Sequence, residues 1–185
     1  MTLLPPYAPE FSAWFSQFER TCFRLETLAF YGGSGEDASL AAYLAGQYPP
    51  PDAERQDWTR LVRAATSRGR LMSRVHVVTE PLSDYLRFEL AWSYPQSVTA
   101  GEDVRILLVA GDGWPAGIPR SDFWLFDDRE LFNMVYASDG RWLGAEYVTD
   151  PAVVARACQA RASALHVAQS WAEFVQVRPE LRVSA

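Results

Sequence analysis

Lysine is absent from this chain of 185 residues, and all 17 basic residues are arginine. Asparagine occurs once and isoleucine twice, so residues with AT-rich codons are rare, as expected of a GC-rich genome. Without lysine there is no side-chain amine for a Schiff base or for a P-loop. Every cation is instead a planar guanidinium, which binds carboxylates and phosphates with paired hydrogen bonds.

Cysteine and histidine are also scarce, with two of each in the chain: Cys22, Cys158, His76 and His166. They show no spacing typical of a zinc site, so we expect no metal, and no motif predicts a cofactor. Both thiols lie in apolar patterns and are interpreted as structural thiols of a reducing compartment. His76 lies in an apolar segment and is interpreted as a core histidine.

Long hydrophobic runs are missing as well, since no apolar stretch reaches the roughly 18 residues of a membrane-spanning helix. The first ten residues have neither a basic start nor an apolar segment, so we expect no secretory signal and a cytoplasmic location. The net charge of −6 argues against direct binding to nucleic acid, which normally needs an excess of basic charge.

The hydrophobic content of 49% is enough for one domain with a core. Apolar spacing predicts helices over 10–19, 37–45, 52–67, 81–94 and 150–175. Alternating or continuous apolar runs predict strands over 21–28, 71–79, 104–110, 123–126, 131–137 and 141–148. Pro95 is expected to end the fourth helix, and Asp150 with Pro151 to begin the last one.

This order of elements predicts an α+β fold: an antiparallel sheet with helices packed mainly on one face and a long C-terminal helix. Prolines at positions 5, 6 and 9 indicate an extended N-terminal arm over residues 1–9. Residues 10–185 are expected to form a single domain.

Three aromatic side chains and a leucine stand between carboxylates in the segment 122–128, DFWLFDD. Asp127 and Asp128 follow directly after an expected strand. Paired carboxylates there could line a ligand pocket together with Trp124, or bind a metal or act as acid and base. The alternative is that they form a turn, for which Asp is a favoured residue.

The segment 79–90, TEPLSDYLRFEL, offers a second candidate. In a helix Asp84 and Arg87 are three residues apart and share a face, and Tyr85 and Glu89 share a neighbouring face. This group could hold a polar ligand, or it could be a surface ion pair beside a core aromatic.

Arginines gather between positions 55 and 74, with little acidic charge beside them. Arg60, Arg63 and Arg70 could form a docking patch for phosphate or for an acidic partner, or they could be the solvated face of a helix. Trp114 lies in a glycine- and proline-rich loop and is the tryptophan most expected to be available to a partner.

Several segments occur in an order typical of a known family: 23–28 (FRLETL) followed by a tyrosine, 74–78 (RVHVV), 81–90 (PLSDYLRFEL), 122–128 (DFWLFDD) and 140–142 (GRW). Together they resemble an actinobacterial, Streptomyces-type family of uncharacterised proteins, a domain of unknown function with an FWLFDD-like signature. The resemblance covers nearly the whole chain. It implies that the protein is encoded near helix-turn-helix regulators and their small partner proteins, and it implies no catalytic residue.

Two functions remain open from the sequence. The first is a non-catalytic cytoplasmic interaction or ligand-sensing module that works with a helix-turn-helix regulator or its small partner protein. The second is a small enzyme or small-molecule-binding protein of a natural-product pathway, with a pocket between sheet and helices. The sequence names neither the partner, the ligand nor the oligomeric state.

Overall fold

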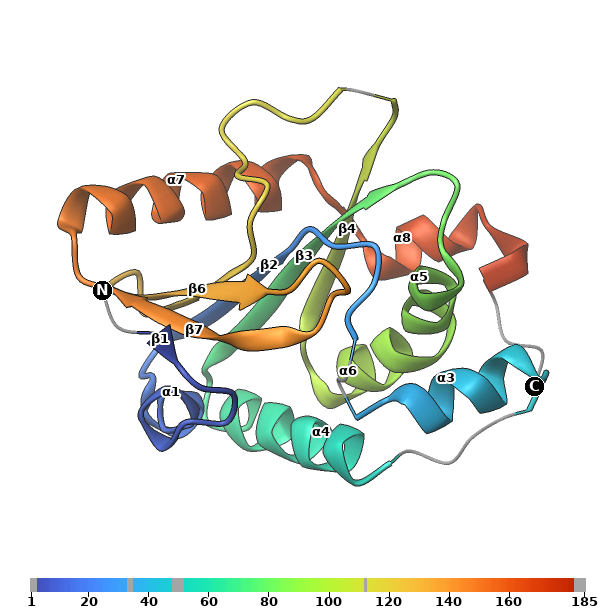
Figure 1. Ribbon diagram of the computed structural model, residues 1–185, viewed down its shortest axis with the longest axis horizontal. Helices are drawn as coiled ribbons and strands as arrows, with labels where there is room; N and C mark the ends of the chain where they lie inside the picture. The colour runs from blue at the N-terminus through green and yellow to red at the C-terminus, as the bar shows by residue number, and fades with distance from the viewer. Residues whose placement is uncertain (1–2, 33–34, 48–51, 112, 182–185) are drawn as a thin grey trace.

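The structure is a computed structural model that describes residues 3–32, 35–47, 52–111 and 113–181. These residues form one eight-stranded sheet with the strand order β1-β7-β6-β5-β2-β3-β4-β8 (Figure 1). The strands are β1 (Leu3–Leu4), β2 (Thr21–Glu26), β3 (Leu71–Thr79), β4 (Asp103–Val109), β5 (Phe123–Phe126), β6 (Glu130–Tyr136), β7 (Trp142–Val148) and β8 (Gln169–Ser170).

The helices of the described residues are α1 (Pro9–Ser12), α2 (Trp14–Gln17), α3 (Asp37–Leu44), α4 (Ala53–Thr66), α5 (Asp84–Phe88), α6 (Tyr94–Ala100), α7 (Pro151–Val167) and α8 (Trp171–Gln176). One π-helical turn, Glu89–Ser93, joins α5 to α6, and a 3₁₀ turn, Pro179–Leu181, follows α8.

The sheet is mixed rather than purely antiparallel, which corrects the expected fold in one respect. Strand β2 pairs in parallel with β3, and β3 pairs in parallel with β4, whereas the other pairings are antiparallel. Helices α3 and α4 lie between β2 and β3 in the chain, and α5 and α6 lie between β3 and β4. A connection that contains helices carries the chain back to the start of the sheet, so the strands it joins run parallel.

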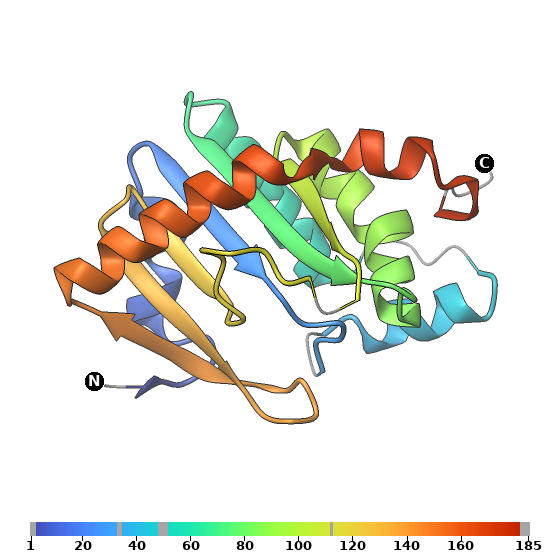
Figure 2. The same cartoon turned by 90° about the horizontal axis from the view of Figure 1, so that it is seen from above.

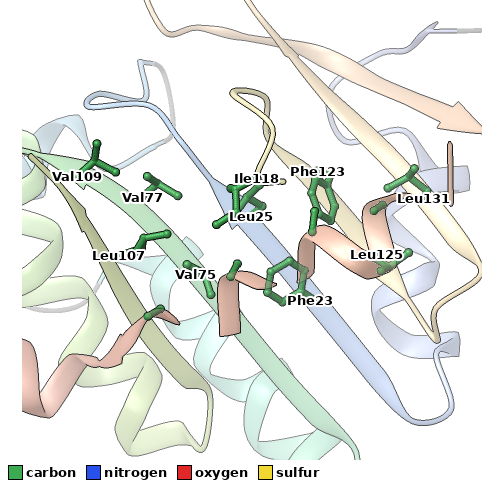
Figure 3. Close-up of a cluster of buried hydrophobic side chains, with 14 of the residues drawn as sticks. Phe23, Leu25, Val75, Val77, Leu107, Val109, Ile118, Phe123, Leu125 and Leu131 are labelled. Atoms are coloured by element: carbon green, nitrogen blue, oxygen red, sulfur yellow. The ribbon is translucent and has the colours of Figure 1, made fainter. Parts of the chain in front are cut away.

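Different helices cover the two faces of the sheet (Figures 1 and 2). Helix α7 crosses one face and buries small residues, Ala157, Ala160 and Ala164, against the strands. Figure 3 shows the strand side chains of this core, which come from alternate positions such as Phe23 and Leu25 of β2. The opposite face lies against α1, α2 and α4, and it holds the candidate site described below.

The C-terminal helix is shorter than expected. Helix α7 ends at Val167, because Ala168 is extended and Gln169–Ser170 pairs with the edge of β4. Ser170 then caps α8 in a capping box with Glu173, so the apolar pattern up to residue 175 belongs to two helices.

The expected helix over 81–94 is replaced by α5, the π turn and α6. Pro95 does not end it: Pro95 lies in the first turn of α6, where no backbone N–H is needed, and the helix continues to Ala100. Gly101, with a φ of 108°, forms the cap that ends α6.

The expected N-terminal arm begins as an edge strand in the described residues. Leu3 and Leu4 pair with Glu146 and Ala145 of β7, and α1 begins at Pro9. Residues 1–2 and 182–185 lie outside the described part of the chain. Within that part, no helix is both long and apolar enough to cross a membrane.

Candidate functional site

A cavity of about 620 Å³ lies between the strands and the helices α1, α2 and α4. Its apolar lining is largely aromatic: Phe11, Phe15, Trp58, Trp124, Tyr136 and Trp142. Its polar lining consists mainly of charged side chains from the two central strands, from α4 and from the π turn. A pocket of this size, apolar with a few polar groups that converge, is typical of a site for a small molecule.

Strand register explains why charged residues meet in the centre of the sheet. Arg24 of β2 lies beside Arg74 of β3 on one side and beside Trp124 of β5 on the other. Alternate residues of a strand point to the same face, so Glu26 and His76 follow on that face one step along. Phe23, Leu25, Val75 and Val77 consequently face α7.

Glu26 is the centre of a buried ionic network. Its Oε1 lies 2.8 Å from Nε of Arg24, and its Oε2 lies 3.0 Å from Nη1 of Arg74. Arg74 also contacts Oε1 of Glu102 at 2.6 Å, and Glu102 accepts a hydrogen bond of 3.0 Å from the indole of Trp58. Burial alone would raise the pKa of Glu26, but the two arginines lower it to about 2.

A second group of charges lies at the helical side of the cavity. Arg55 of α4 donates to Glu36, which precedes α3, and Glu36 also accepts hydrogen bonds from Tyr85 and Ser93. The carboxylate of Glu89 is less well satisfied. Its Oε1 lies 3.7 Å from Nη2 of Arg55, and among the described residues it has no hydrogen-bond partner.

Glu89 is only 3% exposed, although it lines the cavity. Burial, and then the neighbouring Glu36 carboxylate, raise its pKa to about 8. The residue begins the π turn Glu89–Ser93. Such turns are rare and occur frequently at functional sites. Helix α8 supports the turn, because the indole of Trp171 donates a hydrogen bond of 2.8 Å to the carbonyl of Leu90.

Asp122 closes the far end of the network. It accepts hydrogen bonds from the Tyr31 hydroxyl at 2.6 Å and from the Thr27 backbone and hydroxyl at 2.8 and 2.7 Å. Nη2 of Arg24 lies 3.8 Å away. Burial raises the pKa of Asp122 despite these contacts. The carboxylate therefore holds the segment that follows β2 against the start of β5.

His76 is fully buried and has a partner on each ring nitrogen. Nε2 lies 2.9 Å from the carbonyl of Leu28, which can only accept, so this nitrogen carries the proton. Nδ1 lies 2.5 Å from the Tyr94 hydroxyl, which also lies 3.2 Å from Oε2 of Glu26 and has one proton for these two acceptors. Burial lowers the pKa of His76, which keeps the ring neutral. The expected core histidine is thus placed within the polar network.

Only some of the pocket residues predicted from the sequence line the cavity. Tyr85 and Trp124 line the cavity. Asp84 is exposed at the start of α5, and neither it nor Arg87 is among the lining residues. The helix turns Tyr85 inward and Asp84 outward because neighbouring helical positions point about 100° apart.

Asp127 and Asp128 form the turn between β5 and β6, away from the cavity lining. Both have left-handed backbone conformations, with φ of 51° and 61°. The Asp127 carboxylate accepts three backbone hydrogen bonds, from Glu19 at 2.8 Å, Arg20 at 2.7 Å and Thr21 at 2.9 Å. Burial alone would raise the pKa of Asp127, but the three N–H groups stabilise the charged carboxylate, so that its pKa is lowered. Asp128 is exposed and pairs with Arg161 at 2.6 Å.

The candidate partner residues also have different surroundings. Arg60 and Arg63 are exposed on α4, and Arg60 pairs with Asp57 of the same helix. Arg70 donates to the carbonyl of Ser16 and stacks over the ring of Phe18. Trp114 is half-buried rather than open: it packs against the α7 core, and its indole donates to the carbonyl of Ile118.

Sequence reasoning missed four residues that carry much of the site: Arg24, Glu26, Arg74 and Glu36. A usable signal was present in the strands. Arg24 with Glu26, and Arg74 with His76, lie at alternate positions of otherwise apolar segments. Charged residues in that pattern point to a polar interior beside the core. Helical spacing places Glu89 on one face with Tyr85, and both residues line the cavity. The π turn itself cannot be read from that spacing.

No group of three His, Cys, Asp or Glu side chains is arranged to hold a metal ion within the described residues.

Residues 9–176 match the model of a family described as "Domain of unknown function (DUF6879)". The chain belongs to this family. The resemblance to an uncharacterised domain is thereby confirmed, and the family's description names no activity.

Comparison of the DUF6879 chain with the curated proteins finds no match. Among solved structures, one match is TrmBL2, described as an archaeal chromatin protein that shows a novel mode of DNA binding. The TM-score is 0.46 and the identity 13%, over 86% of this chain and 49% of that chain. The DUF6879 chain thus spans about half of TrmBL2, and a likeness at this level assigns no function.

Proposed function

We propose that this domain is a ligand-sensing module that binds a small molecule in the cavity between the sheet and α4. The observation that carries the proposal is the cavity itself. Its volume of about 620 Å³ lies within the range of small-molecule sites, and an unsatisfied buried carboxylate, that of Glu89, lines it. A buried polar group without a partner costs stability, so a ligand that satisfies it gains affinity.

Ligand binding is tested by thermal shift with a panel of amines, sugars, nucleosides and carboxylic acids on the full chain. A ligand that binds only the native state raises its melting temperature. We expect at least one class to do so, and we expect Leu61→Trp, which fills the cavity from α4, to remove the shift.

Ala64→Trp is the matched control, because Ala64 is exposed on the same helix and does not line the cavity. It should keep the shift. Absence of any shift across the panel would contradict the proposal. Conversion of a bound compound into a product, detected by mass spectrometry, would favour the alternative of a small enzyme.

We further propose that the module acts with a helix-turn-helix regulator or its small partner protein, as the resemblance implies. Helix α4 supports this role, because one side of it lines the cavity while Arg60 and Arg63 are exposed on another. A ligand that contacts Trp58 and Leu61 could therefore affect a partner bound to the same helix.

The partner surface is tested by charge reversal, Arg60→Glu with Arg63→Glu, in a titration against the regulator encoded nearest to the gene. We expect binding to weaken at least tenfold. The double variant Arg141→Glu with Arg156→Glu removes the same exposed charge elsewhere and should bind normally. Unchanged binding by the α4 variant would contradict the assignment of this surface.

A further inference from the structure

We infer that the cavity takes a small organic cation, an amine or quaternary ammonium on an apolar body, with the Glu89 carboxylate as its counter-charge. This inference rests on the proposed function and names the chemical class of its ligand. It follows from three independent features of the described residues: the balance of charge, the unsatisfied carboxylate and the aromatic walls.

Acidic groups outnumber basic groups in the lining of the cavity. Five carboxyl residues face three arginines: Glu26, Glu36, Glu54, Asp57 and Glu89 against Arg24, Arg55 and Arg74. Each arginine already has a carboxylate partner, since Arg24 and Arg74 contact Glu26 and Arg55 contacts Glu36. Glu54 and Asp57 are exposed, and Asp57 pairs with Arg60, so the carboxylate that is buried without an arginine in hydrogen-bond contact is that of Glu89. Removing such a charge from water is costly, and a bound cation offsets that cost.

Among the buried carboxylates of the lining, Glu89 is the one that no arginine contacts at hydrogen-bond distance. Its Oε1 is buried, lacks a hydrogen-bond partner among the described residues and lies beyond hydrogen-bond distance of Arg55. The charged and titratable groups that face it come from four neighbouring elements and from its own helical segment: Glu36, Arg55, Glu26, Arg74, Tyr85 and Tyr94. In the free protein the raised pKa keeps Glu89 largely protonated at pH 7. An arriving cation favours the ionised form, and the proton leaves to solvent.

The aromatic lining suits the rest of such a ligand. Phe11, Phe15 and Trp142 provide apolar surface, and aromatic ring faces attract cations. The cavity lining already contains this interaction, because the Arg24 guanidinium lies 5.0 Å from the Trp124 ring and that of Arg74 lies 5.5 Å from the Trp58 ring. An anionic ligand would instead have to displace a carboxylate from one of these paired guanidiniums, and it would add to the excess of negative charge.

The test compares three probes that share an indole body and differ in charge: tryptamine, which is a cation, tryptophol, which is neutral, and indole-3-propionate, which is an anion. Their affinities for the full chain are measured by calorimetry at pH 7.5 and low ionic strength. We expect tryptamine to bind at least tenfold more tightly than tryptophol, and indole-3-propionate to bind most weakly.

Glu89→Gln keeps the shape of the side chain and removes its charge. We expect this variant to bind tryptamine at least tenfold more weakly and to lose the preference for tryptamine over tryptophol. Glu180→Gln, at an exposed carboxyl outside the cavity, is the control and should behave as the wild-type protein. If Glu89→Gln fails to fold, Glu54→Gln in the cavity lining should weaken tryptamine binding in the same direction.

The outcomes separate this inference from the proposed function. Equal or tighter binding of tryptophol or indole-3-propionate by the wild-type protein overturns the cation assignment and leaves ligand binding in place. Failure of all three probes to bind overturns the cation assignment as well. In that case, the wider panel of the thermal-shift experiment alone decides whether the cavity binds a ligand at all.

Discussion

At the scale of single residues, two buried carboxylates of this protein have opposite surroundings. Asp127 accepts three backbone hydrogen bonds, which lower its pKa, whereas Oε1 of Glu89 lacks a hydrogen-bond partner among the described residues. The first arrangement stabilises the fold, because the N–H groups of Glu19, Arg20 and Thr21 are satisfied by it. The second reduces stability and leaves a group available to a ligand.

We predict that Asp127→Asn lowers the free energy of unfolding by about 1–3 kcal/mol, because a charged acceptor of several backbone N–H groups is replaced by a neutral one. Asparagine tolerates the left-handed conformation of this position, so backbone strain is not added. Asp128→Asn is the matched control: its exposed ion pair with Arg161 contributes little, and it should change stability by less than about 1 kcal/mol. Urea unfolding measures both. Equal effects would contradict the role given to Asp127.

At the scale of elements, the N-terminal strand depends on a glycine opposite it. Gly144 of β7 has a φ of 148°, and a Cβ there would lie 2.1 Å from the carbonyl oxygen of Leu4. The close pairing of β1 with β7 therefore requires the absence of a side chain at this position.

Gly144→Ala is expected to displace β1 and to destabilise the protein by more than the cost of a left-handed alanine alone, which is about 1–2 kcal/mol. Gly69→Ala measures that cost, because Gly69 has a φ of 75° and open space around it. The comparison uses urea unfolding, with amide hydrogen exchange of residues 3–4 as a direct readout of pairing. The same loss of stability in both variants would show that the contact with Leu4 is unimportant.

The sequence predicts the helices and strands better than it predicts the site, and each wrong boundary has a physical cause. The strand over 71–79 is predicted with its correct bounds, because its second half is rich in β-branched valines, which favour strands. The last helix was extended too far, since periodicity continues across the break at 168–170 while the capping of Ser170 restarts it. The π turn replaced an expected α-helix, because hydrogen-bond spacing inside a helix leaves no mark in the apolar pattern.

The candidate site was less predictable than the fold. Tyr85 and Trp124 were selected from the sequence and do line the cavity. The remaining polar lining depends on the parallel pairing of β2 with β3, which places Arg24 beside Arg74. These residues are about fifty positions apart, and only the crossover connection brings them together. Local patterns in one sequence do not show which residues so far apart along the chain lie side by side in the sheet.

At the scale of the whole molecule, the cavity collects side chains from position 7 to position 142. Its charged groups therefore contribute to the stability of the entire fold, and the protonation of Glu89 is coupled to unfolding. The folded-state pKa of about 8 lies above the ordinary value of 4.5, so the folded protein retains a proton that the unfolded chain releases.

From this difference we predict that stability decreases as the pH rises from about 4.5 through 8, with a slope of at most about 1.4 kcal/mol per pH unit from this group. Glu89→Gln should flatten the decrease, whereas Glu180→Gln should leave it unchanged. Urea unfolding between pH 5 and pH 9 measures the slopes. An identical pH profile for the wild-type protein and Glu89→Gln would contradict the assignment of the proton to Glu89.

Three of the seven tryptophans, Trp58, Trp124 and Trp142, lie in the wall of the cavity. The rings of Trp58 and Trp124 are 5.7 Å apart, close enough for their excited states to interact. Indole emission depends on the polarity and the charges around the ring. The protein therefore carries its own optical probe: a molecule that enters the cavity displaces water beside these rings and changes the colour and the intensity of the fluorescence, without any added label.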